Sequence, residues 1–200
     1  MYITILGAGN IGGTLGKKWV AAGHTIIFGV RDPQSPKTQA TLAQINANPL
    51  PIPEAIRAGE VILFSVPWAV VPEIVATNKS ALSGKMLIDA TNNFAGPIIN
   101  NLAALQTVPH APIFRAFNSL GWEHFEHPTR DGVPTDHFYT GPDGEPRQTI
   151  HALIAEVGVR PIWVGDHDRI QIVDNVGALW VTLAFQRGWG RGIAFNLVEK

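Results

Sequence analysis

Short runs of apolar residues recur along the chain, bounded by Gly, Pro or Asn, with helix-like stretches between them. This alternation is typical of βαβ units and a parallel sheet. The pattern predicts strands at residues 2–6, 25–29, 61–65, 86–89, 113–117, 136–140 and 159–164. It predicts helices at residues 11–22, 38–47, 69–82, 98–106, 146–157 and 167–187. The expected fold is therefore α/β, a Rossmann-type, doubly wound and mainly parallel sheet.

The chain changes character at Asp166, where a long apolar helix begins and is followed by Gly188, Gly190 and Gly192. We expect a dinucleotide-binding Rossmann domain over residues 1–165 and a small helical C-terminal domain over residues 166–200. A helix this apolar has more hydrophobic surface than a small domain can bury by itself. We therefore expect a homodimer in which the tails pack together or cap the partner's pocket.

Composition narrows the function classes. Of 200 residues, 46% are hydrophobic and 16% charged, and 15 Lys and Arg against 16 Asp and Glu leave a net charge of −1. No basic surplus marks a nucleic-acid-binding surface. The apolar runs stop short of the roughly 20 residues that cross a bilayer, so we expect no membrane partner. The chain enters an apolar run straight after Met1-Tyr2 without a signal-type segment, which favours the cytoplasm.

Candidate chemistry from reactive side chains is sparse. The chain has no Cys, which excludes disulfides, thiolate metal sites and a cysteine nucleophile. The clusters at residues 124–127 and 166–168 contain His beside acidic residues, without a recognised metal-ligand spacing. We expect no metal site, and no side chain stands out as a catalytic acid or base.

The strongest motif is Gly7-Ala8-Gly9-Asn10-Ile11-Gly12, which follows the first predicted strand and opens the first predicted helix. In a G-x-G-x-x-G loop of this kind, Gly7 permits the tight turn and Gly9 lets backbone approach a pyrophosphate. Gly12 lets the helix pack on its strand. The helix N-terminus then offers amide donors and a positive dipole end to the phosphates. The motif predicts dinucleotide binding.

Arg31 is the residue that bears on the choice between NADP and NAD. About 20 residues after the glycine loop, an NAD enzyme places Asp or Glu against the ribose 2′-hydroxyl. Here the second strand ends in Gly29-Val30-Arg31-Asp32, so a guanidinium stands where the 2′-phosphate of NADP would lie. We favour NADP over NAD. Asp32 keeps the alternative open, because a small shift of the turn would offer it to a ribose hydroxyl.

Further site residues follow later strands. Ser65, Val66, Pro67 and Trp68 come after one predicted strand and Asn92 after the next, where ligands bind in open α/β sheets. Asn92 and Asn118 suit hydrogen bonds to a carboxamide or an isoalloxazine edge, although Asn after a strand is also ordinary turn chemistry. Trp19 and Trp163, on the apolar faces of the first predicted helix and a late predicted strand, fit a core role.

In these residues the chain resembles the NADPH-dependent coenzyme F420 reductases. The shared segments are the glycine loop, Gly23-His24, Gly29-Val30-Arg31, Ser65-Val66-Pro67-Trp68, Arg160-Pro161-Ile162-Trp163-Val164-Gly165, and the tail from Gly188 to Phe195. The resemblance implies that Gly9, Asn10 and Ile11 contact the pyrophosphate and Arg31 the 2′-phosphate. It implies that Val66 and Pro67 form the nicotinamide-side wall. It also places Trp68, Trp180 and Trp189 near the second ring, where flat aromatic side chains suit a tricyclic ligand.

The segment Arg115-Ala116-Phe117-Asn118, with Asp89-Ala90-Thr91-Asn92-Asn93 before it, is instead similar to the reductase domains of metalloreductases. This similarity places Ala116 and Asn118 among the cofactor-binding residues and makes FMN or FAD an alternative to F420.

Three functions follow. The first is an NADP-dependent oxidoreductase that passes hydride between NADP(H) and F420 or a flavin, which needs two stacked rings more than an acid or base. The second is a small hydroxyacid or imine reductase. The hydroxyacid enzymes carry a Lys four residues before an Asn on the first tail helix, where this chain has Gln171 and Asn175. The third is a non-catalytic protein that senses NADP or binds a partner.

Overall fold

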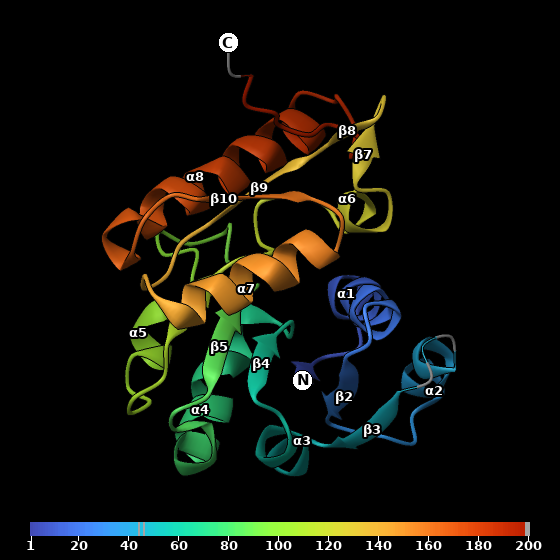
Figure 1. The fold of residues 1–200 in the computed structure, drawn as a ribbon, viewed down its shortest axis with the longest axis vertical. Coiled ribbons are helices and arrows are strands. Elements are labelled where there is room, and N and C mark those ends of the chain that lie inside the picture. Colours follow the sequence, from blue (N-terminus) through green and yellow to red (C-terminus); the bar gives the residue numbers. More distant parts are fainter. Residues whose placement is uncertain (44, 46, 199–200) are drawn as a thin grey trace. The chain divides into compact units, whose positions relative to one another are not determined.

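The computed structural model describes residues 1–43, 45 and 47–198. The chain forms two compact units, residues 1–114 and residues 115–200. In Figure 1 the first unit runs from blue to green and the second from green through yellow to red. Each unit has its own sheet, so each is described by itself.

A six-stranded sheet in the order β3-β2-β1-β4-β5-β6 forms the first unit, with β6 ending at the junction. Its strands are β1 Tyr2–Leu6, β2 Thr25–Val30, β3 Asn48–Pro51, β4 Val61–Phe64, β5 Met86–Asp89 and β6 Ile113–Arg115. The pairs from β3 to β5 are all parallel. The chain reverses its winding direction between β1 and β4, so the predicted Rossmann-type fold is confirmed.

Helices connect these strands, and their ends differ from the predicted ones. They are α1 Asn10–Ala21, α2 Pro36–Leu42, α3 Ile52–Ala58, α4 Val71–Leu82 and α5 Leu102–Leu105. The helix Ile52–Ala58 lies outside every predicted range. The predicted helix at 38–47 stops at Leu42, and residues 44 and 46 of that prediction lie outside the described residues. The prediction missed β3 because Pro49 and Pro51 argue against a strand, yet β3 lies at the sheet edge, where proline is tolerated.

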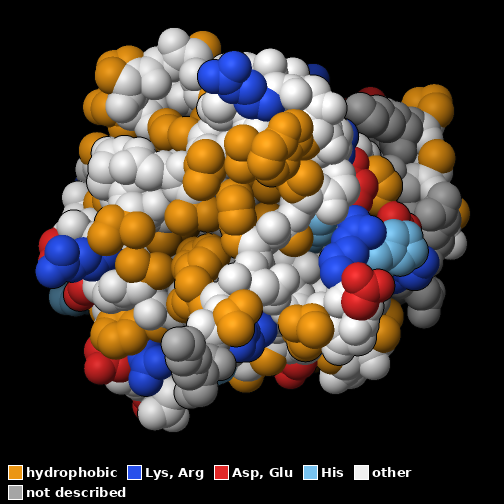
Figure 2. Space-filling model, turned by 90° about the horizontal axis from the view of Figure 1, so that it is seen from above, with side chains coloured by type: hydrophobic (Ala, Val, Ile, Leu, Met, Phe, Trp, Pro, Cys, Tyr) orange, Lys and Arg blue, Asp and Glu red, His pale blue; other side chains and the backbone are white. Residues whose placement is uncertain are grey.

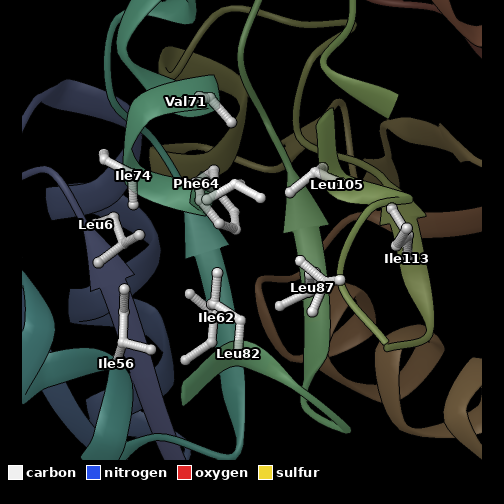
Figure 3. Close-up of a cluster of buried hydrophobic side chains, with 12 residues drawn as sticks. Leu6, Ile56, Ile62, Phe64, Val71, Ile74, Leu82, Leu87, Leu105 and Ile113 are labelled. Carbon is white, nitrogen blue, oxygen red and sulfur yellow. The ribbon is translucent and has the colours of Figure 1, made fainter. Parts of the chain in front are cut away.

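Two apolar layers hold the first unit together. On one face, Leu6, Ile62 and Phe64 pack against α3, α4 and α5, and Figure 3 shows these side chains converging with Ile74 and Leu105. On the other face α1 lies so close that a Cβ at Gly16 would be 2.7 Å from the ring of Phe28. Burial on both faces explains why the central strands are apolar at nearly every position.

The second unit is smaller and more irregular. Its strands are β7 Thr129–Arg130, β8 Val133–Pro134, β9 Asp136–Tyr139 and β10 Arg160–Trp163. Its helices are α6 Glu123–Glu126, α7 Glu145–Glu156 and α8 Ile170–Val181, and α8 continues into a π-helical turn, Thr182–Gln186. Strands β9 and β10 pair in parallel across the α7 connection, and Arg115 bridges to Thr140 in antiparallel fashion.

The end of the chain is bonded to β9. Asp136, wholly buried, accepts hydrogen bonds from the Arg160 guanidinium at 2.5 and 2.8 Å and from the Leu197 N–H at 2.5 Å. The Asp136 N–H in turn donates to the Phe195 carbonyl at 3.1 Å. The expected domain boundary after Gly165 therefore lies inside the second unit, because the tail shares strands β9 and β10 with the residues before it.

Candidate functional site

The glycine loop lies at the sheet's switch point, directly beside the end of β4. Gly7 has a φ of +101°, and a Cβ there would be 2.4 Å from the Ser65 carbonyl oxygen. A Cβ at Gly12 would be 2.3 Å from the Gly7 carbonyl oxygen and 3.3 Å from the Ser65 Oγ. Gly7 and Gly12 are therefore required by the fold itself, and they bring Ser65 to the loop.

Gly9 is glycine for a different reason. It is the N-cap of α1, and a Cβ there would meet no atom within 4 Å. No side chain caps this helix, and its first turn contains no acidic residue. The amides of Asn10 and Ile11 therefore open α1 with the positive end of the helix dipole. An uncapped helix start beside empty space at a bare glycine fits a pyrophosphate group.

Arg31 directly follows β2, the strand next to β1, and its side chain is exposed. The neighbouring Asp32 has a local partner, since its Oδ1 accepts the Gln34 N–H at 2.9 Å. This Asx-type turn uses one carboxylate oxygen, whereas the Arg31 fork is presented at the surface. The arrangement favours recognition of an anion over recognition of a ribose hydroxyl at the end of β2.

Ser65, Val66, Pro67 and Trp68 form the wall that follows β4. The Ser65 N–H donates to the Leu6 carbonyl at 2.9 Å, which extends the β1–β4 pairing up to the wall. The Trp68 Nε1 donates to the Asn100 carbonyl at 3.1 Å, so the indole is fixed by its polar edge. Val66 and Trp68 are half-buried and Pro67 is exposed, as a surface for a planar ligand requires.

Asp89 and Asn101, which are not among the predicted site residues, tie this wall to the end of β5. The buried Asp89 carboxylate accepts the Thr91 N–H at 2.9 Å, the Thr91 hydroxyl at 2.6 Å and the Asn101 N–H at 2.8 Å. The Asn101 side-chain amide donates to the Trp68 carbonyl at 3.2 Å. Asn92, half-buried, directly follows Thr91 in this network. In the sequence, the signal that could have identified Asp89 is its position as the single acidic residue at the end of an apolar strand.

Ala116 and Asn118, the remaining predicted site residues, lie in the second unit. Between them Phe117 has a φ of +61°, an unusual backbone conformation for a bulky residue. Its N–H donates to the His137 Nε2 at 2.7 Å, and the two rings stack at 5.0 Å. Burial lowers the pKa of His137 to about 3, so the imidazole is neutral and accepts this hydrogen bond. A hydrogen bond and a stacked ring thus hold the strained turn.

The structure brings Gly7, Gly12 and Ser65 together, with Gly9, Asn10 and Ile11 on the same loop. It places Trp68 and Asn92 on two connected loops. Trp19 is fully buried, which confirms its core role, while Trp163 is half-buried and donates to the Gly141 carbonyl at 3.0 Å.

Two further observations concern the described residues only. Within residues 1–43, 45 and 47–198, no three His, Asp or Glu side chains are grouped as metal ligands. In the same part of the chain, no helix combines the length and apolarity that a bilayer crossing requires.

Comparison with known proteins agrees with this geometry. Residues 2–93 match the family described as NADP oxidoreductase, coenzyme F420-dependent. The matched stretch contains the glycine loop, Arg31, the Ser65–Trp68 wall and Asn92. The resemblance inferred from the sequence is confirmed over this stretch.

Solved structures resemble the chain over nearly its whole length. A protein of Arthrobacter sp. FB24 named as an F420-dependent NADP-reductase superposes with a TM-score of 0.83 at 19% identity, covering 98% of this chain and 99% of its own. The hypothetical protein SMa0349 of Sinorhizobium meliloti gives 0.71 at 21% identity, covering 100% and 96%. A reductive aminase of Aspergillus terreus gives 0.70 at 20% identity, covering 94% of this chain but only 63% of its own. At these identities the likeness establishes the fold.

Proposed function

We propose that this protein is an NADP-dependent oxidoreductase that passes hydride between NADP(H) and F420 or a flavin. The observation that carries the proposal is the open space at Gly9, beside an uncapped helix and one strand away from the exposed Arg31. The family matched by residues 2–93, named for NADP and F420, supports the same chemistry.

Each part of the site has a role in this proposal. The amides of Asn10 and Ile11 bind the pyrophosphate at the start of α1. The Arg31 guanidinium pairs with the 2′-phosphate in a bidentate, charge-assisted contact. When bound, the nicotinamide supplies or accepts the hydride. Val66 and Pro67 would shield one face of that ring from water and leave the other face open to the hydride partner.

The wall keeps its position through the carboxylate of Asp89. Because Asp89 holds the Asn101 backbone and Asn101 holds the Trp68 carbonyl, the loops after β4 and β5 are fixed together. Hydride transfer is sensitive to sub-ångström placement of the two rings. Asp89 and Asn101 are therefore positioning residues, and we assign to Asn92, which directly follows Thr91, a hydrogen bond to the carboxamide.

A small imine or hydroxyacid reductase is the second candidate, since the fold likeness extends to a reductive aminase. One observation argues against the hydroxyacid class. At the position of its catalytic Lys the chain has Gln171, whose side-chain amide donates to Asn175 at 3.0 Å. A neutral amide pair cannot supply a proton in the way an ammonium group does.

The cofactor part of the proposal is tested with Arg31→Ala. We expect NADPH affinity to fall by about 1.5–3 kcal/mol, with NADH affinity nearly unchanged, because only NADPH carries the 2′-phosphate. Lys79→Ala removes an exposed cation from α4 and serves as the matched control. Titrations by calorimetry measure both dinucleotides, and equal losses for both would show that Arg31 does not contact the 2′-phosphate.

The acceptor is tested by NADPH oxidation at about 340 nm with F420, FMN and FAD offered separately. Turnover with one of these cofactors supports the proposal and identifies the acceptor class. Turnover only with a cyclic imine and an amine would favour the aminase candidate. Tight NADPH binding without turnover of any acceptor would favour a protein that senses NADP.

A further inference from the structure

Residues 117–119 form a turn of the second unit that combines three features, each of which costs stability. Phe117 has a left-handed backbone, which a bulky residue rarely adopts. The Ser119 Oγ is buried and has no hydrogen-bond partner among the residues that the structure describes. Because the His137 Nε2 accepts the Phe117 N–H, the imidazole proton lies on Nδ1, and this group too is buried without a partner in the described part of the chain. We call residues 117–119 the Phe117 turn.

The buried polar groups of the turn do not reflect a shortage of apolar side chains. The second unit leaves Ile172 46% exposed and Leu179 48% exposed on α8. Figure 2 shows hydrophobic side chains gathered in one band on the face seen from above. Apolar residues are thus available, yet the Phe117 turn keeps a hydroxyl and an imidazole inside. Strain and unpaired polar groups that gather in one place are typical of a functional site.

Contacts on both sides hold the Phe117 turn in its strained shape. The His137 ring stacks on the Phe117 ring, and the Phe125 ring packs edge-on against both, with centroids 5.5 Å from Phe117 and 5.4 Å from His137. Before the turn, Arg115 exchanges two backbone hydrogen bonds with Thr140, at 2.9 and 3.1 Å. A turn clamped in this way presents its side chains in one fixed geometry, which lowers the entropic cost of binding a ligand.

The turn carries no net charge. The nearest charged side chain along the sequence, Arg115, is paired with Asp174 at 2.8 Å. Burial lowers the pKa of His137 to about 3, so its imidazole is uncharged at neutral pH. The side chains of the turn itself, the Asn118 amide and the Ser119 hydroxyl, each contain a donor and an acceptor. This set suits an uncharged polar edge of a ligand better than a phosphate or a carboxylate, whose charge it would not balance.

The pyrimidine edge of F420 and of flavins is a group of this kind, since an N–H lies between two carbonyls. We propose that the Ser119 hydroxyl, beside the Asn118 amide, hydrogen-bonds this edge of the hydride partner, and that His137 is the residue that positions the turn for the contact. The inference rests on the proposed function. The nicotinamide carboxamide is also an uncharged donor and acceptor, but its contact is assigned to Asn92, in the first unit.

Ser119→Ala separates a ligand contact from a structural one. A hydroxyl that supports the fold costs stability when it is removed, whereas an unpartnered buried hydroxyl does not. We therefore expect the urea midpoint of Ser119→Ala to stay unchanged or to rise, while the dissociation constant for F420 or FMN rises about 3- to 10-fold. Each cofactor is titrated separately and followed by its own fluorescence.

Thr135→Val is the matched control for Ser119→Ala. It removes another buried hydroxyl that has no partner among the described residues, outside the Phe117 turn. It should change neither the urea midpoint nor the dissociation constants for F420 and FMN. Equal weakening of cofactor binding by both variants would show that the effect does not come from a contact with Ser119, and would overturn the proposal.

Two substitutions test His137 as a positioning residue. His137→Leu removes the group that accepts the Phe117 N–H, whereas His137→Gln keeps an accepting oxygen. His137→Leu should raise the dissociation constant for F420 or FMN about 10-fold or more, with NADPH affinity unchanged, and His137→Gln should recover most of the loss. A merely structural role would lower the stability of His137→Leu and leave cofactor affinity of the folded protein unchanged, which would overturn the assignment of His137.

The outcomes for this inference and for the proposed function are distinct. Wild-type affinity for F420 and FMN in Ser119→Ala, with turnover retained, would overturn the inference and leave the proposed function standing. Binding that Ser119→Ala weakens, without hydride transfer from NADPH, would support the contact and overturn the proposed reaction. Weakened binding of NADPH alone would assign the turn to the carboxamide and overturn the inference. A wild type that binds neither F420 nor FMN would overturn both.

Discussion

The two units place their polar groups differently. In the first unit the predicted ligand-binding groups lie on loops at the strand ends, and the sheet beneath them is almost wholly apolar. In the second unit charged and polar side chains lie inside, among them Arg115, Asp136, His137 and Asp174. Apart from the Asp89 network at the end of β5, the first unit is thus held by apolar packing and glycine turns, whereas the second depends more on the geometry of buried hydrogen bonds.

The largest loss of stability should follow from breaking the buried ion pair of the second unit. Arg115 Nε donates to the Asp174 Oδ1 at 2.8 Å, and each side chain is 1% exposed. Asp174→Asn removes the paired negative charge and should cost about 3–5 kcal/mol, because an uncompensated guanidinium remains buried. Urea unfolding followed by circular dichroism measures the loss.

The matched variant Arg115→Met/Asp174→Leu removes both charges together. It should lose markedly less stability than the single variant, since apolar side chains of similar volume replace the pair. A double variant as unstable as Asp174→Asn would show that packing, and not charge, limits the second unit.

Glycine substitutions test the first unit and separate its two kinds of glycine. Gly12→Ala should cost about 1–3 kcal/mol, because its Cβ meets the Gly7 carbonyl at 2.3 Å and the backbone has to shift. Gly9→Ala should change the free energy of unfolding by less than about 1 kcal/mol, since its Cβ enters open space at a helix N-cap. The same urea titrations compare them.

The substitution that leaves stability almost unchanged, Gly9→Ala, should be the one that affects NADPH binding. Gly9→Ala should weaken NADPH binding in a protein that is still fully folded, because the methyl group occupies the space given to the pyrophosphate. Unchanged NADPH affinity in Gly9→Ala would count against a pyrophosphate at this position.

The pH dependence of stability should come mainly from the second unit. Burial lowers the pKa of His137 to about 3 from its usual 6.5, so between these values the unfolded chain binds more protons than the native protein. The stability that depends on neutral His137 is therefore fully present above pH 6.5. It is lost as the pH falls toward 3, by up to about 1.4 kcal/mol per pH unit.

His137→Gln isolates this contribution, since the Gln oxygen can accept the Phe117 N–H without titrating. Stability of this variant should depend less steeply on pH between about 6.5 and 3. His127→Gln, at an imidazole that is 76% exposed, should keep the wild-type slope. Equal slopes in all three proteins would show that His137 is not the titrating group.

The same contrast explains what the sequence could predict. The glycine loop, its strand and its helix follow local rules, so their positions were predictable to within a residue. Asp89 and Asn101 join through a contact 12 residues apart, and His137 reaches Phe117 across 20 residues. Such pairings depend on tertiary structure and leave no periodic signal. Strand β3 was missed because its prolines are acceptable only at a sheet edge.

The expected domain boundary after Gly165 rests on position along the chain alone. The apolar content of α8 suggested a separate tail, but one buried carboxylate, Asp136, holds β10 and the segment at Leu197 together. A single Asp in a four-residue strand gives no sequence signal of this role. The excess apolarity of α8 was visible in the sequence, and the structure shows that Ile172 and Leu179 remain exposed on it.

The smallest loss of stability should come from breaking the exposed ion pair between Arg191 and Glu123. Arg191 donates to both Glu123 carboxylate oxygens, at 2.5 and 3.0 Å, with 41% and 27% of the two side chains exposed. Burial opposes ionisation of Glu123, but the hydrogen bonds and charge of Arg191, a backbone hydrogen bond and the charge of His124 together outweigh it, so the pKa of that carboxyl lies below its usual value. The pair's stabilisation is thus present at neutral pH and lost as the pH falls through the lowered pKa.

Arg191→Gln should cost only about 0–1 kcal/mol at neutral pH, because water and salt screen exposed pairs. Urea titrations at low and high salt measure it, and a loss as large as that of Asp174→Asn would show that surface and interior charges of the second unit contribute alike.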